Sequence, residues 1–160
     1  MYYQNVTVVV TPRPSSHGSG ASSGRDRRAV IRDPELASRL LEQVRPHIPA
    51  TMSAEWDGRR LEVSLAALFS PLRVYRYHAG QHFGFHQDQS YRRDDGTRSL
   101  LTLMVYLDDD FDGGETDFPE QGERIAPARG DGLWFQHMVL HAGRPVTRGV
   151  KHVLRTDVLY

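Results

Sequence analysis

The sequence RSLLTLMVYL occupies residues 98–107, and VKHVLRTDVL occupies residues 150–159. Both runs are rich in β-branched and large apolar residues, a composition that favours β-strands. Further short apolar stretches alternate with breaks rich in Gly, Asp and Pro, at 71–77, 82–86, 123–127 and 131–136. About seven or eight strands spaced in this way are typical of a double-sheet jelly roll. We therefore predict a jelly-roll core over residues 59–160.

The sequence ahead of this core predicts a helix and a flexible connection. Residues 33–35, Asp-Pro-Glu, supply an N-cap, a proline at the first helical position and an acid in the first turn. Apolar residues then recur at helical spacing, which predicts an amphipathic helix at about 34–46. Residues 2–10 predict a strand, and residues 11–25 a flexible Gly/Ser-rich loop. The prediction is a single domain, residues 1–160, mainly β with flanking helices.

The composition argues against several classes of protein. Acidic and basic residues cancel at 20 each, so no net field would attract nucleic acid or anionic lipid. No apolar run approaches the ~20 residues of a membrane span. The first residues lack the basic and apolar regions of a signal peptide, so we expect a cytoplasmic protein without a membrane partner. Because the chain has no cysteine, any metal must be bound by His, Asp or Glu.

A pattern of histidine and carboxylate residues indicates a metal site. His86 and Asp88 lie two positions apart, and His141 follows after a gap of about fifty residues. The single lysine of the chain, Lys151, comes ten positions after His141. Two imidazoles and one carboxylate can occupy three adjacent corners of an octahedral Fe(II), which leaves positions for a chelating cosubstrate and oxygen. A cation just beyond the last ligand is suited to anchor the far carboxylate of that cosubstrate.

The local sequence around His86 favours a strand over a helix. His78, His82 and His86 recur every four residues and would share one face of a zinc-binding helix. Two glycines interrupt such a helix, and phenylalanines flank the last histidine. In a strand, His86 and Asp88 point to the same face while the residue between them points away. The end of one strand can therefore supply two ligands side by side.

Each of these residues also has an ordinary structural explanation. One His-x-Asp pair is expected by chance in a chain of this composition, so the pair alone carries a high risk of a false match. His86 and Asp88 would then be a surface pair, and His141 a hydrogen-bonded core histidine. Lys151 would be a solvated lysine on an edge strand. For the remaining histidines of the core we expect positions facing solvent or behind the ligands: His78, His82, His137 and His152.

Several short motifs follow one another in the core. They are Arg76-Tyr77-His78-Ala79-Gly80, His86-x-Asp88, Leu103-Met104-Val105-Tyr106-Leu107, Gly113-Gly114-Glu115-Thr116, His141-Ala142-Gly143-x-Pro145-Val146 and Gly149-Val150-Lys151-x-Val153-Leu154-Arg155. With these motifs, residues 73–160 resemble the 2-oxoglutarate- and Fe(II)-dependent dioxygenases, specifically the prolyl-4-hydroxylase-like branch. The resemblance implies a double-stranded β-helix with the metal between its two sheets.

The resemblance also implies a role for each matching residue. Lys151 would pair with the C5 carboxylate of 2-oxoglutarate, and Tyr77 would donate a hydrogen bond to this cosubstrate. Arg155, on the same strand face, would contact the metal-bound end of 2-oxoglutarate or replace Lys151 as its anchor. Metal-bound imidazoles are oriented by residues that hydrogen-bond to their other ring nitrogen, and Gln136, His137 and Thr102 are the candidates for this role. Three residues would ligate Fe(II): His86, Asp88 and His141.

An enzyme of this kind would be a 2-oxoglutarate-dependent dioxygenase. It would consume dioxygen, hydroxylate an unactivated C–H bond and release succinate and CO2, with ascorbate as a candidate reductant. Asp88 indicates hydroxylation, because related halogenases lack that carboxylate. The substrate would be a small molecule, such as an amino acid or secondary metabolite, or a peptidyl residue. The oligomeric state stays open.

Two other functions also stay open at this point. A jelly-roll site that holds zinc or manganese would catalyse a non-oxidative reaction and would need no 2-oxoglutarate. A sensor would bind the metal or 2-oxoglutarate without consuming the latter. The polar loop at 87–98 contains Tyr91, Arg92 and Arg93. These residues suit an anionic or peptide substrate, and they equally suit a solvated loop.

Overall fold

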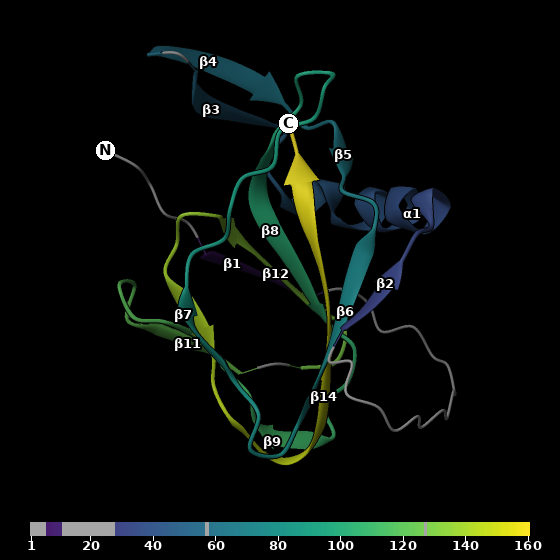
Figure 1. Ribbon diagram of the computed structural model, residues 1–160, viewed down its shortest axis with the longest axis vertical. Coiled ribbons are helices and arrows are strands. Elements are labelled where there is room, and N and C mark those ends of the chain that lie inside the picture. The colour runs from purple at the N-terminus through teal and green to yellow at the C-terminus, as the bar shows by residue number, and fades with distance from the viewer. Residues whose placement is uncertain (1–5, 11–27, 57, 127) are drawn as a thin grey trace.

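The computed structural model describes residues 6–10, 28–56, 58–126 and 128–160. The loop predicted at 11–25 lies outside the described residues. These residues form two β-sheets, a hairpin and one α-helix (Figure 1). The helix, α1 (Pro34–Val44), has 11 residues. No helix in the described part of the chain has the length and apolar character needed to cross a membrane.

The larger sheet has eight strands, all joined by antiparallel pairs. Six of them lie in the order β1 (Val6–Val10), β12 (Asp131–Gln136), β8 (Ser99–Tyr106), β14 (Val146–Leu159), β6 (Leu72–His78) and β2 (Arg28–Ile31). Two short strands also pair with β14: β5 (Ala67–Leu68) and β9 (Phe111–Gly113). β14 has 14 residues and pairs with four other strands, so it holds the sheet together.

The smaller sheet faces the larger one. Its strands lie in the order β11 (Glu123–Ile125), β10 (Thr116–Phe118), β13 (His141–Gly143) and β7 (Phe83–His86). Phe118 of β10 packs in one buried cluster with Phe135 and Val153 of the larger sheet. The mainly β jelly roll predicted from the sequence is therefore confirmed. β8 and β14 correspond to the runs at 98–107 and 150–159.

The helix covers the outer face of the larger sheet. The Asp33 side chain accepts a hydrogen bond from the Leu36 N–H at 2.9 Å, with a proline following the cap. A 3-10 turn over Arg45–His47 follows the α-helix, so the helix predicted at 34–46 is confirmed. Its buried side chains belong to a second core cluster with residues of β8 and β14: Ala37, Leu41, Val44, Leu101, Leu103, Leu154 and Val158.

A hairpin before the main strands was not predicted. β3 (Thr51–Trp56) and β4 (Arg59–Ser64) pair with each other in a two-stranded sheet. Gly58 has a φ of +73°, a conformation that glycine adopts without steric cost. The Asp-Gly dipeptide at 57–58, between two alternating runs, is a known signal for a two-residue hairpin loop. That signal could have predicted the hairpin.

Candidate metal centre

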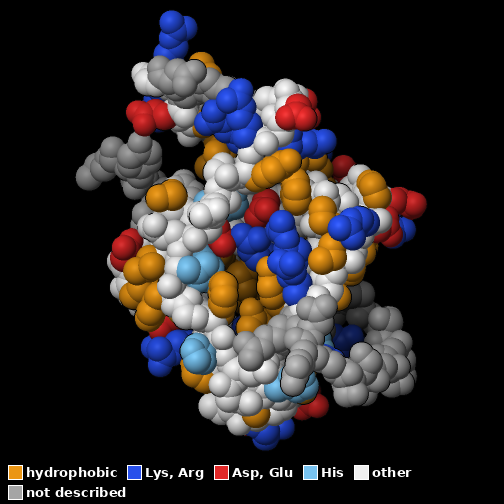
Figure 2. Space-filling model, viewed as in Figure 1, with side chains coloured by type: hydrophobic (Ala, Val, Ile, Leu, Met, Phe, Trp, Pro, Cys, Tyr) orange, Lys and Arg blue, Asp and Glu red, His pale blue; other side chains and the backbone are white. Residues whose placement is uncertain are grey.

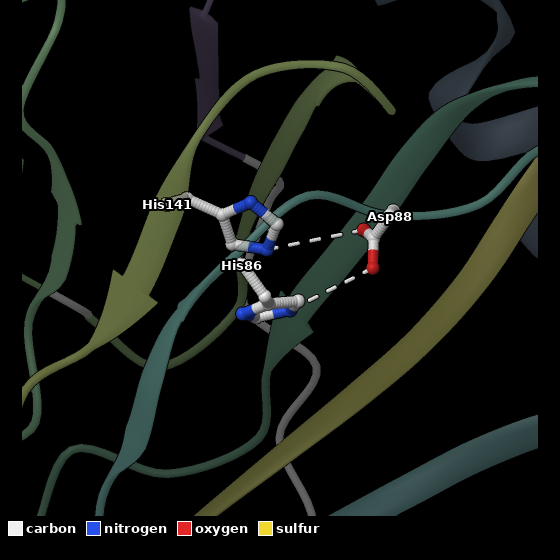
Figure 3. A group of neighbouring side chains, drawn as sticks. All are labelled: His86, Asp88 and His141. Atoms are coloured by element: carbon white, nitrogen blue, oxygen red, sulfur yellow. Dashed lines mark ion pairs between the residues drawn. The ribbon is translucent and has the colours of Figure 1, made fainter.

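The fold brings His86, Asp88 and His141 together. His86 ends β7 and His141 begins β13, and the two residues are antiparallel partners in the smaller sheet. Asp88 follows two residues after β7. One ligand atom from each of the three side chains lies within 4.8 Å of the others, and Figure 3 shows the two rings directed towards the carboxylate. The pattern in the sequence therefore corresponds to a real cluster.

The spacing of these atoms suits an ion between them. His86 Nε2 lies 3.7 Å from Asp88 Oδ1, and His141 Nε2 lies 3.9 Å from Asp88 Oδ2. Both distances exceed the ~2.7–3.2 Å of a direct hydrogen bond. The three side chains therefore converge without bonding to one another.

Both histidines present a lone pair to the centre. His86 Nδ1 lies 2.9 Å from the Gly84 carbonyl oxygen, and His141 Nδ1 lies 2.9 Å from that of Val139. A carbonyl only accepts, so each Nδ1 carries a proton, and the neutral form of each ring has its lone pair on Nε2. Burial lowers the pKa of His141 below its usual value, which also favours the neutral ring. Neutral imidazoles with a free Nε2 are in the form that binds a metal.

Asp88 is held in its charged form. Its side chain is 8% exposed, and burial alone would raise its pKa. The positive charge of Arg155 and hydrogen bonds from Thr102 and Arg155 outweigh burial and lower the pKa below the usual value. Thr102 Oγ1 donates to Asp88 Oδ2 at 2.5 Å, and Arg155 Nη2 lies 2.8 Å from Asp88 Oδ1. The carboxylate is therefore ionised and fixed at both oxygens.

A pocket between the sheets opens onto this centre. Its volume is about 160 Å³, roughly ten times the ~10–15 Å³ that one water needs by the same measure. In Figure 2 the molecule is hollowed near the middle of the face in view, and basic side chains lie beside apolar ones there. Besides the three residues of the centre, the lining includes Tyr75, Tyr77, Lys151 and Arg155. The pocket therefore has room for a small organic molecule next to the metal position.

Lys151 is a buried cation at the wall of this pocket. It is 3% exposed, and its Nζ donates to the Gly114 carbonyl at 2.5 Å. Nζ also lies 5.1 Å from the ring centre of Tyr106 and 6.0 Å from that of Tyr77. Burial lowers the pKa of Lys151 to about 8, although the negative charges of Glu115 and Asp108 act to raise it. Among the described residues, no carboxylate lies within ion-pair distance of Nζ.

Arg155 lines the same pocket but has carboxylate partners. Besides Asp88, its Nη2 lies 3.3 Å from Asp157 Oδ1. Lys151 and Arg155 both project from the inner face of β14, as expected from their separation of four residues. The two cations therefore differ in environment, since one is paired with two carboxylates and the other with none.

The pocket is also lined by residues that were not predicted from the sequence. Tyr75 lies two residues before Tyr77 on β6, and their rings stack with centres 6.4 Å apart. Phe83 is 51% exposed at the pocket wall and meets the His86 ring edge-on at 4.1 Å. Strand alternation would have predicted Tyr75, whereas it places Phe83, three positions before His86 on β7, on the opposite face of the strand.

Three of the other histidines, His78, His82 and His137, lie as expected, and His152 is half-buried. His78 and His82 are exposed, and His82 lines the pocket. His152 pairs with Asp108, its Nδ1 lying 2.5 Å from Oδ2. His137 is buried behind Asp88. Of the residues expected to orient the imidazoles, Thr102 instead bonds the Asp88 carboxylate, and His137 accepts a hydrogen bond from the Asp88 backbone N–H.

Comparison with known proteins places this site in a family context. The family model of the 2OG-Fe(II) oxygenase superfamily matches residues 72–156. A putative prolyl 4-hydroxylase of Acanthamoeba polyphaga mimivirus is 32% identical over 100 residues, covering 51% of this chain and 41% of that protein. A PKHD-type hydroxylase of Pseudomonas putida (strain W619) is 36% identical over 126 residues, covering 74% of this chain and 51% of that protein. The chain thus spans about half the length of these curated relatives.

Solved structures show the same architecture. The viral collagen prolyl hydroxylase of Paramecium Bursaria Chlorella virus-1, solved as its 2OG complex, superimposes with a TM-score of 0.57 at 23% identity, covering 82% of this chain and 78% of that one. A Trichoplax adhaerens prolyl hydroxylase, in complex with a hypoxia inducible factor peptide fragment, gives 0.55 at 16% identity, covering 96% and 82%. At these identities the likeness concerns the fold.

Proposed function

The chain belongs to the 2OG-Fe(II) oxygenase superfamily, and we propose that it hydroxylates an unactivated C–H bond with Fe(II), 2-oxoglutarate and dioxygen. The observation that carries this proposal is the convergence of His86, Asp88 and His141 within 4.8 Å. Two imidazole nitrogens and one carboxylate are the donor set of the facial triad that binds non-haem Fe(II) with open positions.

The protein's own residues would hold and orient the iron. His86 Nε2, His141 Nε2 and the Asp88 carboxylate would be its ligands. When bound, iron and 2-oxoglutarate would supply the oxidising chemistry, coupling decarboxylation of the cosubstrate to hydroxylation. The neutral imidazoles and the ionised carboxylate carry one negative charge between them, so the site offsets part of the metal charge.

We propose Lys151 as the anchor of the C5 carboxylate of 2-oxoglutarate. A buried ammonium without a carboxylate partner forms a strong, charge-assisted hydrogen bond with an incoming carboxylate. Tyr77, its neighbour across the β6–β14 pair, would donate a further hydrogen bond to the cosubstrate. Arg155 already has two carboxylate partners. Its proposed role is therefore near the metal-bound end, where it stabilises Asp88, and not as the anchor.

The substrate class is a further part of the proposal. The relatives' names include prolyl 4-hydroxylases, and one structural neighbour was solved with a peptide. Phe83 of β7 lines the pocket and is 51% exposed, and Phe85 of the same strand is 53% exposed. They favour a peptidyl residue, which would leave apolar chain outside the pocket. The pocket volume equally admits a free amino acid or another small metabolite.

The setting of the activity is proposed from the sequence. We propose a cytoplasmic enzyme that acts without a membrane or nucleic acid partner, since the chain has a formal net charge of +0 at pH 7. Ascorbate is a candidate reductant for iron oxidised in unproductive turnover.

Succinate formation tests the proposed reaction. We expect the Fe(II)-loaded protein to convert 2-oxoglutarate to succinate only in the presence of air, and candidate peptides or amino acids to accelerate this turnover and gain one oxygen atom. Asp88→Ala should abolish it. Asp94→Ala, which removes an exposed carboxylate from the neighbouring loop, is the matched control and should leave it unchanged. Undiminished succinate from Asp88→Ala would contradict the proposal.

A further inference from the structure

Behind the Asp88 carboxylate lies a buried pair of polar residues, Thr102 and His137. We propose that they are positioning residues, which fix the orientation of this carboxylate for the metal through one directed chain of hydrogen bonds. The inference rests on the proposed function, because it assumes that Asp88 is a metal ligand. It adds Thr102 of β8 and His137, directly after β12, to the residues on which metal binding depends.

The contacts of Thr102 connect the two other residues. Thr102 is fully buried on the inner face of β8. Its Oγ1 lies 2.5 Å from Asp88 Oδ2 and 3.0 Å from His137 Nδ1. A single hydroxyl group therefore connects the carboxylate to the imidazole.

The proton positions along this chain follow from the chemistry of the groups. An ionised carboxylate can only accept, so the single Thr102 hydroxyl proton points to Asp88. The Thr102 oxygen must then accept from His137, which places the imidazole proton on Nδ1. The order of donation is His137 to Thr102 to Asp88. In this order the imidazole prevents the hydroxyl from rotating away from the carboxylate.

His137 also holds the backbone of Asp88. Its carbonyl oxygen accepts the Asp88 N–H at 2.8 Å, and its own N–H donates to the Leu100 carbonyl at 3.2 Å. His137 is 3% exposed, and its Nε2 is buried without a hydrogen-bond partner among the described residues. A leucine would fill that space at no polar cost if packing were the only role. The histidine is thus explained by what its Nδ1 does.

Metal affinity is the readout that separates positioning from packing. Residues behind a ligand typically change metal affinity by about 10- to 100-fold when they are altered. We expect that loss for Thr102→Val, which replaces the hydroxyl with a methyl group, and for His137→Leu. Thr102→Ser keeps the hydroxyl and should bind close to the wild type. His137→Asn keeps an amide N–H near the Nδ1 position, so it should restore affinity while lowering the melting temperature through its smaller volume.

The measurement is the Kd of Mn(II), followed by electron paramagnetic resonance, beside thermal unfolding of every variant. Unchanged affinity in Thr102→Val, or equal affinities of His137→Asn and His137→Leu, would overturn the inference. If His137→Leu does not fold, the comparison of Thr102→Val with Thr102→Ser decides, and equal affinities would overturn it. A wild-type protein that binds no metal would overturn the proposed function itself. Binding by the wild type with no effect in the variants would overturn only the positioning role.

Discussion

The two faces of the larger sheet bury different kinds of residue, although the same strands supply both. On β14, Leu154 and Val158 point outwards and pack under α1 in an apolar cluster. Lys151 and Arg155 point inwards and line the pocket, and Asp157 is buried beside Arg155. Burying a leucine side chain contributes about 1.5–3 kcal/mol, whereas burying a charge costs free energy unless it is paired. The outer face therefore stabilises the fold. This stabilisation offsets the free energy that it costs to bury charged side chains on the inner face, where they can bind ligands.

Lys151→Met tests the inner face and should have the largest effect of these substitutions, on the affinity for 2-oxoglutarate. Removing one partner of a buried charge pair costs about 2–5 kcal/mol, so we expect the Kd of 2-oxoglutarate to rise by at least about 30-fold. The free energy of unfolding should stay the same or rise, because a buried charge is removed. Calorimetric titration of the Mn(II)-loaded protein measures the first quantity, and urea unfolding the second.

Arg148→Met is the matched control for this substitution. Arg148 is an exposed cation of the same strand that pairs with Asp112, so its loss should leave the affinity for 2-oxoglutarate unchanged. An unchanged affinity in Lys151→Met would move the anchor role to Arg155.

Leu41→Ala tests the outer face. It should lower the free energy of unfolding and leave the affinity for 2-oxoglutarate unchanged. Leu41 is 7% exposed in the cluster between α1 and the sheet. Truncation of such a leucine costs about 2–5 kcal/mol of unfolding free energy. The Kd of 2-oxoglutarate should not change at a temperature where the variant is folded. Weaker binding by folded Leu41→Ala would show that the two faces are energetically coupled.

The smallest of these effects is the pH dependence of cosubstrate binding. Before binding, the pKa of Lys151 is lowered to about 8, so the ammonium is present below this pH and is lost above it. A bound carboxylate favours the ammonium, so the pKa rises in the complex. The Kd of 2-oxoglutarate should therefore be nearly constant below about pH 8 and increase by up to about tenfold per unit above it. Calorimetry at several pH values should show this increase in the wild type and no such increase in Lys151→Met.

The parts of the molecule that could be predicted from the sequence are those that short stretches of sequence or residue types specify. Asp33 and the proline after it mark the start of α1, and the alternating apolar runs mark β8 and β14. His86, Asp88, His141 and Lys151 could be selected because their residue types and order already describe the chemistry. β10 and β13 have three residues each, too few for a periodicity to be visible.

The network around Asp88 depends on contacts between distant residues. Thr102 is 14 positions from Asp88, and His137 is 35 positions from Thr102. The register of β8 with β12 brings Thr102 near His137, and a backbone hydrogen bond joins Asp88 to His137. Register is set by the whole sheet and not by local sequence. Thr102, His137 and Gln136 therefore stayed equal candidates at the level of sequence.

The position of β14 also has a consequence for biosynthesis. β14 lies between β6 and β8 in the larger sheet, yet it is the last of the described strands to be translated. Until residues 146–159 have left the ribosome, β8 has an unpaired edge along its uncharged run SLLTLMVY. Exposed, uncharged strand edges promote aggregation, and sheets closed by distant segments form slowly. We therefore expect the nascent chain to depend on chaperones more than its size alone would suggest.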